Sequence, residues 1–323
     1  MGRSVLEEAR STTYTRYPQR RQAKPVTWSR QFGIDALFLL PAFILFTMVV
    51  MYPILSGLYY GFTDWDGINP HIGFIGLTNF IKMFQDTVLW ITVRNMVIFA
   101  LVTTLVQMVL GLVLALALHG SKRIFATLRV LYLLPIILGG LAIALAFRYI
   151  YNPSIGLLNA LLAGIGHSAW GQDWLGNVHL VLGSIIAANA WQWVGFTMII
   201  FLAGLQAVPT ELHDAANIDG ANSWQHFWAV TWPLLAPSTT VNLLLTIIGS
   251  LKVFDIILVM TGGGPGYASE SIVVYLFSRA FGNTTSAPDS YGYPAAISIV
   301  LSLAIFLISL GALKILLRRE VEF

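Results

Sequence analysis

The sequence of 323 residues contains no cysteine, and charged residues make up only 10% of it. Without cysteine the chain has no disulfide, no thiolate nucleophile and no cysteine metal site. A soluble globular chain carries about 25% charged residues, so this scarcity of charge argues against an ordinary soluble domain. Apolar residues take the place of charge, because 57% of the chain is hydrophobic and the mean hydropathy is +0.75. These values predict an integral membrane protein.

Patterns for catalysis and nucleotide binding are missing as well. A P-loop needs a Gly-Lys-Ser/Thr run, and the dipeptide Gly-Lys does not occur in the sequence. The glycine-rich run at 262–266 follows an apolar segment and predicts a turn rather than a phosphate site. The six histidines lack metal-ligand spacing, and we find no nucleophile motif. We therefore expect a chain that is not an enzyme and holds no metal or cofactor, so any energy that its activity needs comes from another subunit or an ion gradient.

Six apolar segments are long enough to cross a bilayer, which takes about 20 residues. They are residues 36–62, 91–118, 125–147, 180–205, 234–260 and 294–317. The expected fold class is an all-α membrane protein with six transmembrane helices. We divide the chain into a polar, basic arm at residues 1–33 and one membrane domain at residues 34–323, with no soluble domain and no tandem repeat.

Lys and Arg are unevenly distributed over the segments that flank the spans. Four lie on one side, at Lys82, Arg94, Arg148 and Arg279. Thirteen lie on the other side, at Arg3, Arg10, Arg16, Arg20, Arg21, Lys24, Arg30, Lys122, Arg123, Arg129, Lys314, Arg318 and Arg319. Because positive residues flank the cytoplasmic ends of spans, we expect both termini in the cytoplasm, which agrees with an even number of spans. The arm is expected to be a cytoplasmic anchor rather than a nucleic-acid site.

One segment on the cytoplasmic side, residues 207–233, has no Lys or Arg but contains three carboxylates. We expect a short helix that begins at an N-cap, Thr210, and ends at Gly220, since glycine readily adopts the left-handed conformation. A second helix is expected to start at Asn222 or Ser223 and to end before Pro233. The segment could dock into a groove of a cytoplasmic partner, or it could be an amphipathic connector lying on the membrane.

The order of residues in this segment carries a resemblance to a known family. Residues 214–221 read Asp-Ala-Ala-Asn-Ile-Asp-Gly-Ala, and Trp-Gln-x-Phe at 224–227 and Thr-Trp-Pro-Leu-Leu at 231–235 follow. This run closely resembles the EAA loop of permease subunits of binding-protein-dependent ABC importers, with Asp214 where glutamate is usual. Further phrases, at residues 74–80, 134–135, 203–205, 253–255 and 261–266, resemble the carbohydrate-uptake branch, similar to maltose- and multiple-sugar-type permeases. Residues 1–33 are not covered by this resemblance.

The resemblance implies a type I ABC importer permease (MetI-like) fold and a pore-forming subunit for a sugar or oligosaccharide in a prokaryotic inner membrane. The 209–221 loop would be the coupling helix that docks into an ATPase subunit. Its coupling residues would be Glu211, Asp214, Ala215, Ala216, Asp219, Gly220 and Ala221. The implied partners are a second homologous permease, two ATPase subunits that hold ATP and Mg, and an extracytoplasmic solute-binding protein.

Polar residues inside the spans are candidates for a substrate path, because amides and carboxylates bind sugar hydroxyls while aromatic rings pack against sugar C–H faces. They are Asn189, Trp191, Gln192, Asn242, Thr246, Lys252 and Asp255. Lys252 and Asp255, three apart in the expected fifth helix, would share one helix face as part of the path or as an internal ion pair. Packing between helices is the open alternative for the tryptophans, and hydrogen bonding between helices for Asn242 and Thr246.

Two other functions compete with a sugar importer. One is a glycerol-phosphate or polyol permease of the same class. A phosphorylated solute would want clustered basic residues, but Lys252 is the only basic residue well inside a span. An ion-coupled secondary sugar transporter belongs to a different class, and the spans contain few carboxylates to support it. A membrane enzyme lacks any catalytic constellation in the sequence.

Overall fold

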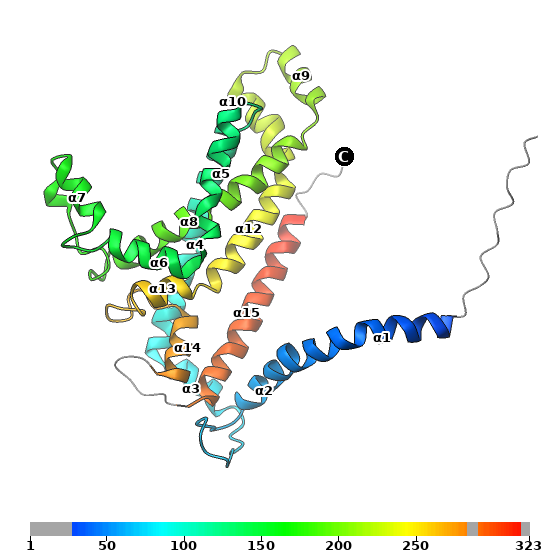
Figure 1. Ribbon diagram of the computed structural model, residues 1–323, viewed down its shortest axis with the longest axis vertical. Helices are drawn as coiled ribbons and strands as arrows, with labels where there is room; N and C mark the ends of the chain where they lie inside the picture. The colour runs from blue at the N-terminus through cyan, green and yellow to red at the C-terminus, as the bar shows by residue number, and fades with distance from the viewer. Residues whose placement is uncertain (1–27, 283–289, 318–323) are drawn as a thin grey trace, which may run out of the picture. The chain divides into compact units, whose positions relative to one another are not determined.

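The structure is a computed structural model that describes residues 28–282 and 290–317 (Figure 1). These residues are almost entirely helical, and their only β pairing is an isolated antiparallel bridge between Thr63 and Phe74. The chain divides into two compact units, residues 1–55 and 56–323. Most of the basic arm predicted at residues 1–33 lies outside the described residues, and helix begins inside it, at Trp28.

The first unit contains helix α1, Trp28–Phe46, a π-helical turn, Thr47–Met51, and the beginning of α2, Tyr52–Tyr60. Together they give an apolar stretch, Ala36–Tyr60, that is 25 residues long with a mean hydropathy of 2.3. A helix satisfies its own backbone hydrogen bonds, so a lone apolar helix is stable in lipid. This element confirms the first predicted span in place and length.

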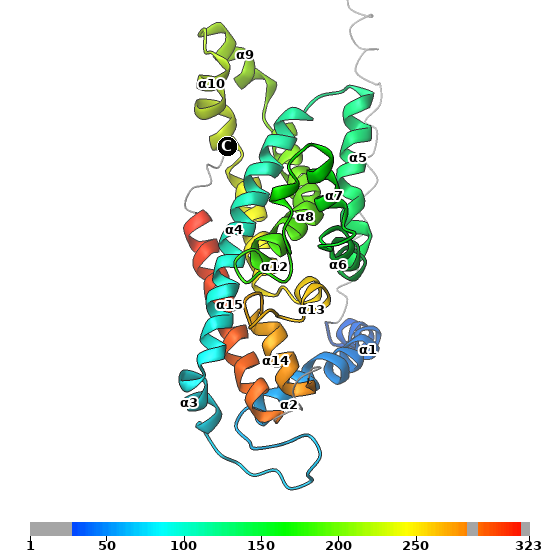
Figure 2. The ribbon, with the colours of Figure 1, turned by 90° about the vertical axis from the view of Figure 1, so that its left-hand side faces the viewer.

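Four long helices form the centre of the second unit. They are α4, Thr87–Ala117, α8, Val181–Gln206, α12, Ala236–Leu251, and α15, Gly292–Leu317. Helix α4 packs against both α8 and α12, and α15 packs along α12 (Figure 2). Small residues allow the closest approach, as at Gly111, where an added Cβ would lie 2.5 Å from a methyl of Thr197. The helices bury three apolar clusters, the largest built around Phe99, Ile185 and Ile257.

Two predicted spans are broken rather than continuous. The segment at 125–147 forms α5, Arg123–Ile137, and α6, Gly139–Ile150, which meet at an angle of 94°. Gly139 allows this bend because its φ is +73°, a conformation that other residues rarely adopt. Counting each bent pair as one span gives six spans, as predicted.

The break in the fifth span corrects a specific prediction. Helix α12 ends at Leu251, and α13, Asp255–Met260, begins only after three residues. Lys252 and Asp255 therefore do not share one helix face, because the helix ends between them. The backbone at the break has a partner, since the hydroxyl of Ser271 donates to the carbonyl oxygen of Val253 at 3.0 Å. Non-helical backbone at membrane depth is tolerated where protein satisfies it in this way.

The approach to the fifth span also differs from the prediction. Helix α10, Ser223–His226, continues through a π-helical turn, Phe227–Thr231, into α11, Trp232–Leu234, and this piece is bent by 66° from α12. The helix was expected to end before Pro233 but runs through it. Proline is tolerated here because it lies in the first turn of α11, where a backbone N–H is not needed.

The remaining helices are short. They are α3, Thr78–Gln85, α7, Leu157–Gly164, a 3₁₀ turn, Ser168–Trp170, α9, Thr210–Ile218, and α14, Ile272–Phe281. Within the second unit, α3 and the start of α15 lie at one end, and α9 and α10 lie at the other (Figures 1 and 2). We refer to these as the α3 end and the α9 end.

A single carboxylate ties the α3 end together. One oxygen of Asp86 caps α4 by accepting from the backbone N–H groups of Val88 and Leu89 at 3.0 and 3.1 Å. The other oxygen accepts from the hydroxyls of Tyr275 in α14 and Tyr293 in α15, both at 2.5 Å. Burial opposes the charge, but the tyrosine hydroxyls and the backbone N–H of Leu89 hold the pKa of Asp86 below its ordinary value.

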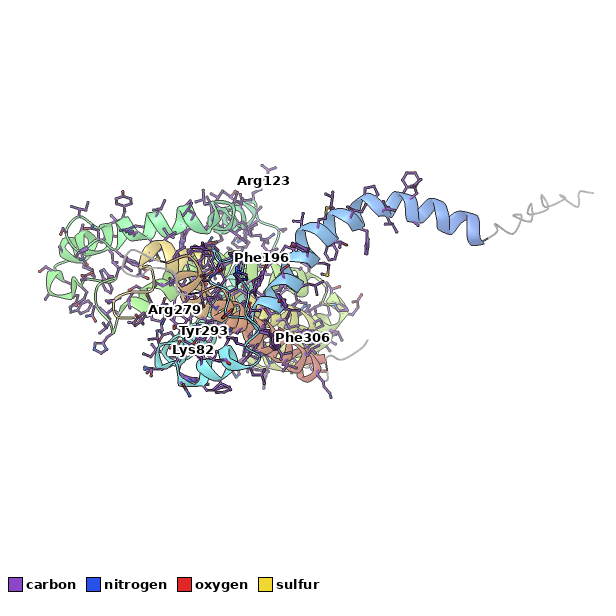
Figure 3. All side chains as sticks on the ribbon, turned by 90° about the horizontal axis from the view of Figure 1, so that it is seen from below. Lys82, Arg123, Phe196, Arg279, Tyr293 and Phe306 are labelled. Carbon is purple, nitrogen blue, oxygen red and sulfur yellow. The ribbon has the colours of Figure 1, made fainter. Side chains whose placement is uncertain are left out.

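Two cations complete this cluster. The Nε of Arg279 donates to the Tyr275 hydroxyl at 3.0 Å, and its guanidinium lies 5.1 Å from the Tyr275 ring centre. The ammonium of Lys82 lies 4.7 Å from the ring centre of Tyr293, and the two side chains are seen together in Figure 3. Helices α3, α4, α14 and α15 are thus joined by one charge-assisted network.

Candidate functional site

A cavity of about 490 Å³ lies within the second unit, between α4, α6, α8, α12 and α13. Polar and charged side chains form much of its wall. They are Gln107, Asn189, Gln192, Thr197, Asn242, Thr246, Ser250, Lys252 and Asp255. Six of the seven residues that the sequence suggested for a substrate path therefore line one cavity. Sequence spacing could group these residues only within single helices. The fold brings together residues of three helices, α8, α12 and α13, around the same cavity.

Hydrogen bonds hold several of these side chains in place. The Gln107 amide donates to the Asn189 side-chain oxygen at 3.2 Å, which joins α4 to α8. The Asn242 amide donates to the Thr197 carbonyl at 3.2 Å, which joins α12 to α8, and the Thr246 hydroxyl donates to the Asn242 carbonyl. Asn242 thus bonds a neighbouring helix and also borders the cavity, whereas the hydrogen bond of Thr246 lies within α12.

The aromatic part of the wall differs from the expectation. Trp193 and Phe196 line the cavity, with ring centres 6.4 Å apart and planes nearly perpendicular; Phe196 is labelled in Figure 3. Trp191 is not part of the lining and packs edge-on against Phe147 at 5.4 Å. Helical spacing from Asn189 contained this signal, because residues three, four and seven further along share its face.

The two broken spans meet at the cavity. An added Cβ on Gly140, at the start of α6, would lie 3.4 Å from a carboxylate oxygen of Asp255, the first residue of α13. Lys252 lines the same cavity at the end of α12. Lys252 and Asp255, which the sequence placed on one helix, thus lie where the break between α12 and α13 meets the bend between α5 and α6. The sequence signal that could have located this junction is the pair Gly139-Gly140 in the third apolar segment.

The acidic segment forms a second candidate site, at the α9 end. Pro209, not Thr210, precedes the first helical residue of α9, and no side chain caps this helix. Gly220 has a φ of +74° and ends the helix as expected, while the Ala221 N–H donates to the Ala216 carbonyl at 3.0 Å. The side chains of Glu211, Asp214, Ala215 and Asp219 are exposed, whereas Ala216 is buried. The helix therefore presents its carboxylates outward.

A pair of histidines connects α9 to the helix that follows. Nδ1 of His213 and Nε2 of His226 are 2.8 Å apart, and the rings stack with centres 4.7 Å apart. Nδ1 of His226 is 3.4 Å from the Thr231 hydroxyl. Asn222 and Gln225 form a capping box at the start of α10. The two histidines are 13 positions apart in the sequence, and this spacing gave no signal of the pairing.

The two sites lie in a stretch of chain that can be compared with known proteins. Residues 107–321 match the family described as the inner membrane component of binding-protein-dependent transport systems. The chain belongs to this family. The matched region includes α8, the acidic segment and α12, and hence most of the cavity wall.

Relatives of similar length support this membership. The chain is 33% identical to the probable starch degradation products transport system permease protein AmyD of Thermoanaerobacterium thermosulfurigenes, covering 88% of this chain and 94% of the relative. It is 32% identical to the trehalose/maltose transport system permease protein MalF of Thermococcus litoralis, covering 88% and 94%. It is also 34% identical to the probable ABC transporter permease YurN of Bacillus subtilis, covering 87% and 95%.

A solved structure supports the fold. A bacterial ABC transporter involved in the import of the acidic polysaccharide alginate contains a chain with a TM-score of 0.75 and 23% identity. The match covers 90% of this chain and 96% of that one. The prediction of a MetI-like importer permease fold is confirmed by this similarity and by the family match. Our chain is a membrane-embedded permease of this transport family.

Proposed function

We propose that this permease is the pore-forming subunit of an ATP-driven importer for a neutral sugar or oligosaccharide. It lies in a prokaryotic inner membrane with both termini in the cytoplasm, so the α9 end is cytoplasmic and the α3 end faces outward. It is not an enzyme and binds no cofactor, because ATP and Mg are held by partner ATPase subunits. Its other partners are a second homologous permease and an extracytoplasmic solute-binding protein.

The composition of the cavity wall is the observation that carries the sugar assignment. The space is bordered by four side-chain amides, three hydroxyls and three aromatic side chains, which are Gln107, Asn189, Gln192, Asn242, Thr197, Thr246, Ser250, Trp193, Phe196 and Phe254. Amides and hydroxyls pair with sugar hydroxyls, and rings cover sugar C–H faces. Lys252 is the only basic residue in the wall among the described residues, whereas a phosphorylated solute would want several. The relatives named for starch products and for trehalose and maltose support the same class.

A continuous path of chain links the acidic segment to this cavity. Helix α9 bonds to α10 through the histidine pair, and α10 continues through α11 into α12. Helix α12 carries Asn242, Thr246 and Ser250 along the cavity wall. A force applied to α9 would therefore reach the wall through helical elements, with the bend at Leu235 as the hinge. In our proposal an ATPase subunit applies that force to residues 209–221.

Two-state closure of the ATPase pair would then switch the cavity between the two sides of the membrane. Docking uses the exposed carboxylates Glu211, Asp214 and Asp219 as acceptors for basic or backbone donors on the ATPase. The small side chains of Ala215, Ala216 and Ala221 allow the backbone of a partner to come close, and Gly220 forms the turn that follows. Each of these positions is a proposed coupling residue.

Uptake by the complete importer in vesicles tests the proposal. With its partner permease, ATPases and binding protein, the chain should accumulate radiolabelled maltose or trehalose only when ATP is inside. Gln192→Leu should lower uptake about tenfold by removing a cavity amide, while Gln206→Leu, on the exposed end of the same helix, should leave it unchanged. Uptake that does not depend on ATP but requires a proton or sodium gradient would refute the proposal.

A further inference from the structure

Three tryptophans form a ladder along the helix that leads into α12. Trp224, Trp228 and Trp232 follow one another at four-residue spacing, with ring centres 5.6 and 5.9 Å apart and edge-to-face planes. Trp224 is 71% exposed and Trp228 is 48% exposed. Phe227 supports the ladder from the side, at 5.2 Å from Trp228 and 6.2 Å from Trp232. Such rings in a row are costly to leave in water, so the ladder requires an apolar surface.

The charge of residues 207–233 bears on how this segment could attach to a membrane surface. Residues 207–233 contain no Lys or Arg, whereas the neighbouring flank carries Lys122, Arg123 and Arg129. Basic side chains near a cytoplasmic leaflet hold a segment to anionic headgroups. Residues 207–233 lack that means of attachment. Trp is the other residue type that membrane proteins place at the headgroup level, because its ring is apolar and its N–H is polar.

The position of the ladder in the fold favours the bilayer as the covering surface. The helix that carries it continues directly into α12, which together with it passes the length and composition test for a bilayer-crossing segment. A bend of 66° separates the two, so the ladder helix turns away from the direction of α12 at the point where α12 begins. With α12 as the crossing segment of the proposed function, the ladder helix precedes it on the cytoplasmic side, and the bend turns the ladder helix away from the crossing direction.

We infer that Trp224 and Trp228, supported by Trp232, insert into the headgroup region of the cytoplasmic leaflet and anchor the entrance to the fifth span. The orientation rests on the proposed function. The acidic segment then has two halves with different partners, since the carboxylates of α9 are repelled by an anionic leaflet while the ladder is drawn into it. The anchor gives α9 a fixed point against which it can move.

The absence of cysteine from the chain makes a direct test possible, because one introduced cysteine can be spin-labelled alone. Trp224→Cys and Trp228→Cys are made separately, and Ile218→Cys, 85% exposed on α9, is the matched control. Each variant is assembled with cysteine-free partner subunits in vesicles that contain anionic lipid. Electron paramagnetic resonance then compares collisions of the label with oxygen, which enriches in lipid, and with a water-soluble nickel chelate.

The inference expects oxygen collisions to exceed nickel collisions at least threefold at positions 224 and 228, and nickel to exceed oxygen, or neither reagent to reach the label, at position 218. Protection from both reagents at 224 and 228 would assign the ladder to a protein partner and overturn the inference. Dominant nickel collisions there would do the same, since the ladder would then face water. If one ladder variant fails to assemble, the other still decides the question.

The readout separates this inference from the proposed function. Label accessibility does not require transport, so lipid contact at 224 and 228 in an importer that moves no sugar would keep the anchor and reject the sugar assignment. A further pair, Trp228→Tyr and Trp228→Glu, distinguishes anchoring from mere space filling. Tyrosine should keep the lipid signal of a label at 224, and glutamate should reduce it at least twofold. An equal signal in both variants would contradict the anchor.

Discussion

The α3 end and the α9 end of the larger unit are built on opposite principles. At the α3 end, the half-buried Asp86 carboxylate accepts hydrogen bonds from α4, α14 and α15, and Arg279 and Lys82 add charge to the same cluster. At the α9 end, Glu211, Asp214 and Asp219 are exposed, and α9 is held to the rest chiefly by two histidine rings. The Asp86 carboxylate finds its hydrogen-bond donors within the chain, whereas the carboxylates of α9 are open to donors from another molecule.

This difference has a mechanical meaning. A carboxylate that accepts hydrogen bonds from several helices fixes their geometry, because any movement breaks several charge-assisted bonds at once. A short helix with exposed acceptors and few contacts opens at small free-energy cost and offers those acceptors to another protein. The α3 end is suited to hold its shape, and the α9 end is suited to be held by a partner and moved.

The first prediction concerns the turn at the α9 end. Gly220→Val should abolish ATP-driven uptake, by at least tenfold, and remove stimulated ATPase activity. A β-branched residue at a φ of +74° is strained by about 1–2 kcal/mol, so the turn that ends α9 will rearrange. No neighbour lies within 4 Å of the added Cβ, so the effect comes from the backbone and not from a clash.

Gly76 provides the matched control for this change. It has a φ of +61° and equally open surroundings, but it precedes α3 at the other end of the unit. Gly76→Val should cost similar local strain and leave coupling intact. Transport and ATPase assays on both variants in reconstituted complexes make the comparison, and equal losses would mean that the α9 turn has no special role.

The second prediction concerns the carboxylate at the α3 end. Asp86→Ala should lower the free energy of unfolding by about 3 kcal/mol, because α4 loses its cap and two buried tyrosine hydroxyls lose their acceptor. Asp66→Ala, which removes a carboxylate that bonds only the backbone of its own exposed loop, should cost below about 1 kcal/mol. Thermal denaturation in detergent measures both, and comparable shifts would remove the contrast between the clamp and an ordinary loop.

Much of this architecture could be predicted from the sequence, but the Asp86 cluster could not. The spans and the end of α9 follow from local signals: apolar runs, and a glycine where a left-handed residue is needed. Asp86 and its tyrosine partners are 189 and 207 positions apart, and nothing in a single sequence pairs them.

The candidate cavity was partly predictable for a similar reason. Helical spacing places Asn189 and Gln192 on one face, and it should also have selected Trp193 over Trp191. The breaks could not be read from hydropathy, because Leu138 is apolar and the break at 252–254 holds a single charge, Lys252, beside Val253 and Phe254. Hydropathy reports where a chain is buried in lipid, while the direction of the chain depends on close approaches such as that of the Gly140 backbone to Asp255.

The third prediction is a pH dependence at Glu270, which lies between α13 and α14 and interacts with the charge of Arg279. Glu270 is 3% exposed, one of its oxygens has no hydrogen-bond partner among the described residues, and burial raises its pKa to about 7 although Arg279 opposes the shift. Because the folded-state pKa lies above the unfolded value near 4.5, stability is lost as pH rises toward 7 and beyond. From pH 6 to pH 8.5 the loss should be on the order of 1 kcal/mol.

Glu270→Gln tests this directly. The amide has nearly the same shape and no charge to lose, so the variant's melting temperature should change less between pH 6 and pH 8.5 than that of the natural protein. At pH 8.5 the variant should be the more stable of the two. A pH profile identical in both proteins would show that Glu270 does not titrate in this range and causes no loss of stability on ionisation.

The smallest expected effect is at the histidine pair. It tests whether α9 is attached to α10 by few contacts. His213→Ala removes one partner of a half-exposed hydrogen bond, which is worth about 1 kcal/mol, so global stability should hardly change. Backbone amides of α9 should nevertheless exchange with deuterium severalfold faster, because that contact is a main attachment of α9 to α10. His179→Ala, at an exposed loop position, is the control and should leave exchange in α9 unchanged. If exchange in α9 is already as fast in the natural protein as in the variant, the pair transmits no force, and movement of α9 must reach α12 through the backbone at 219–222 alone.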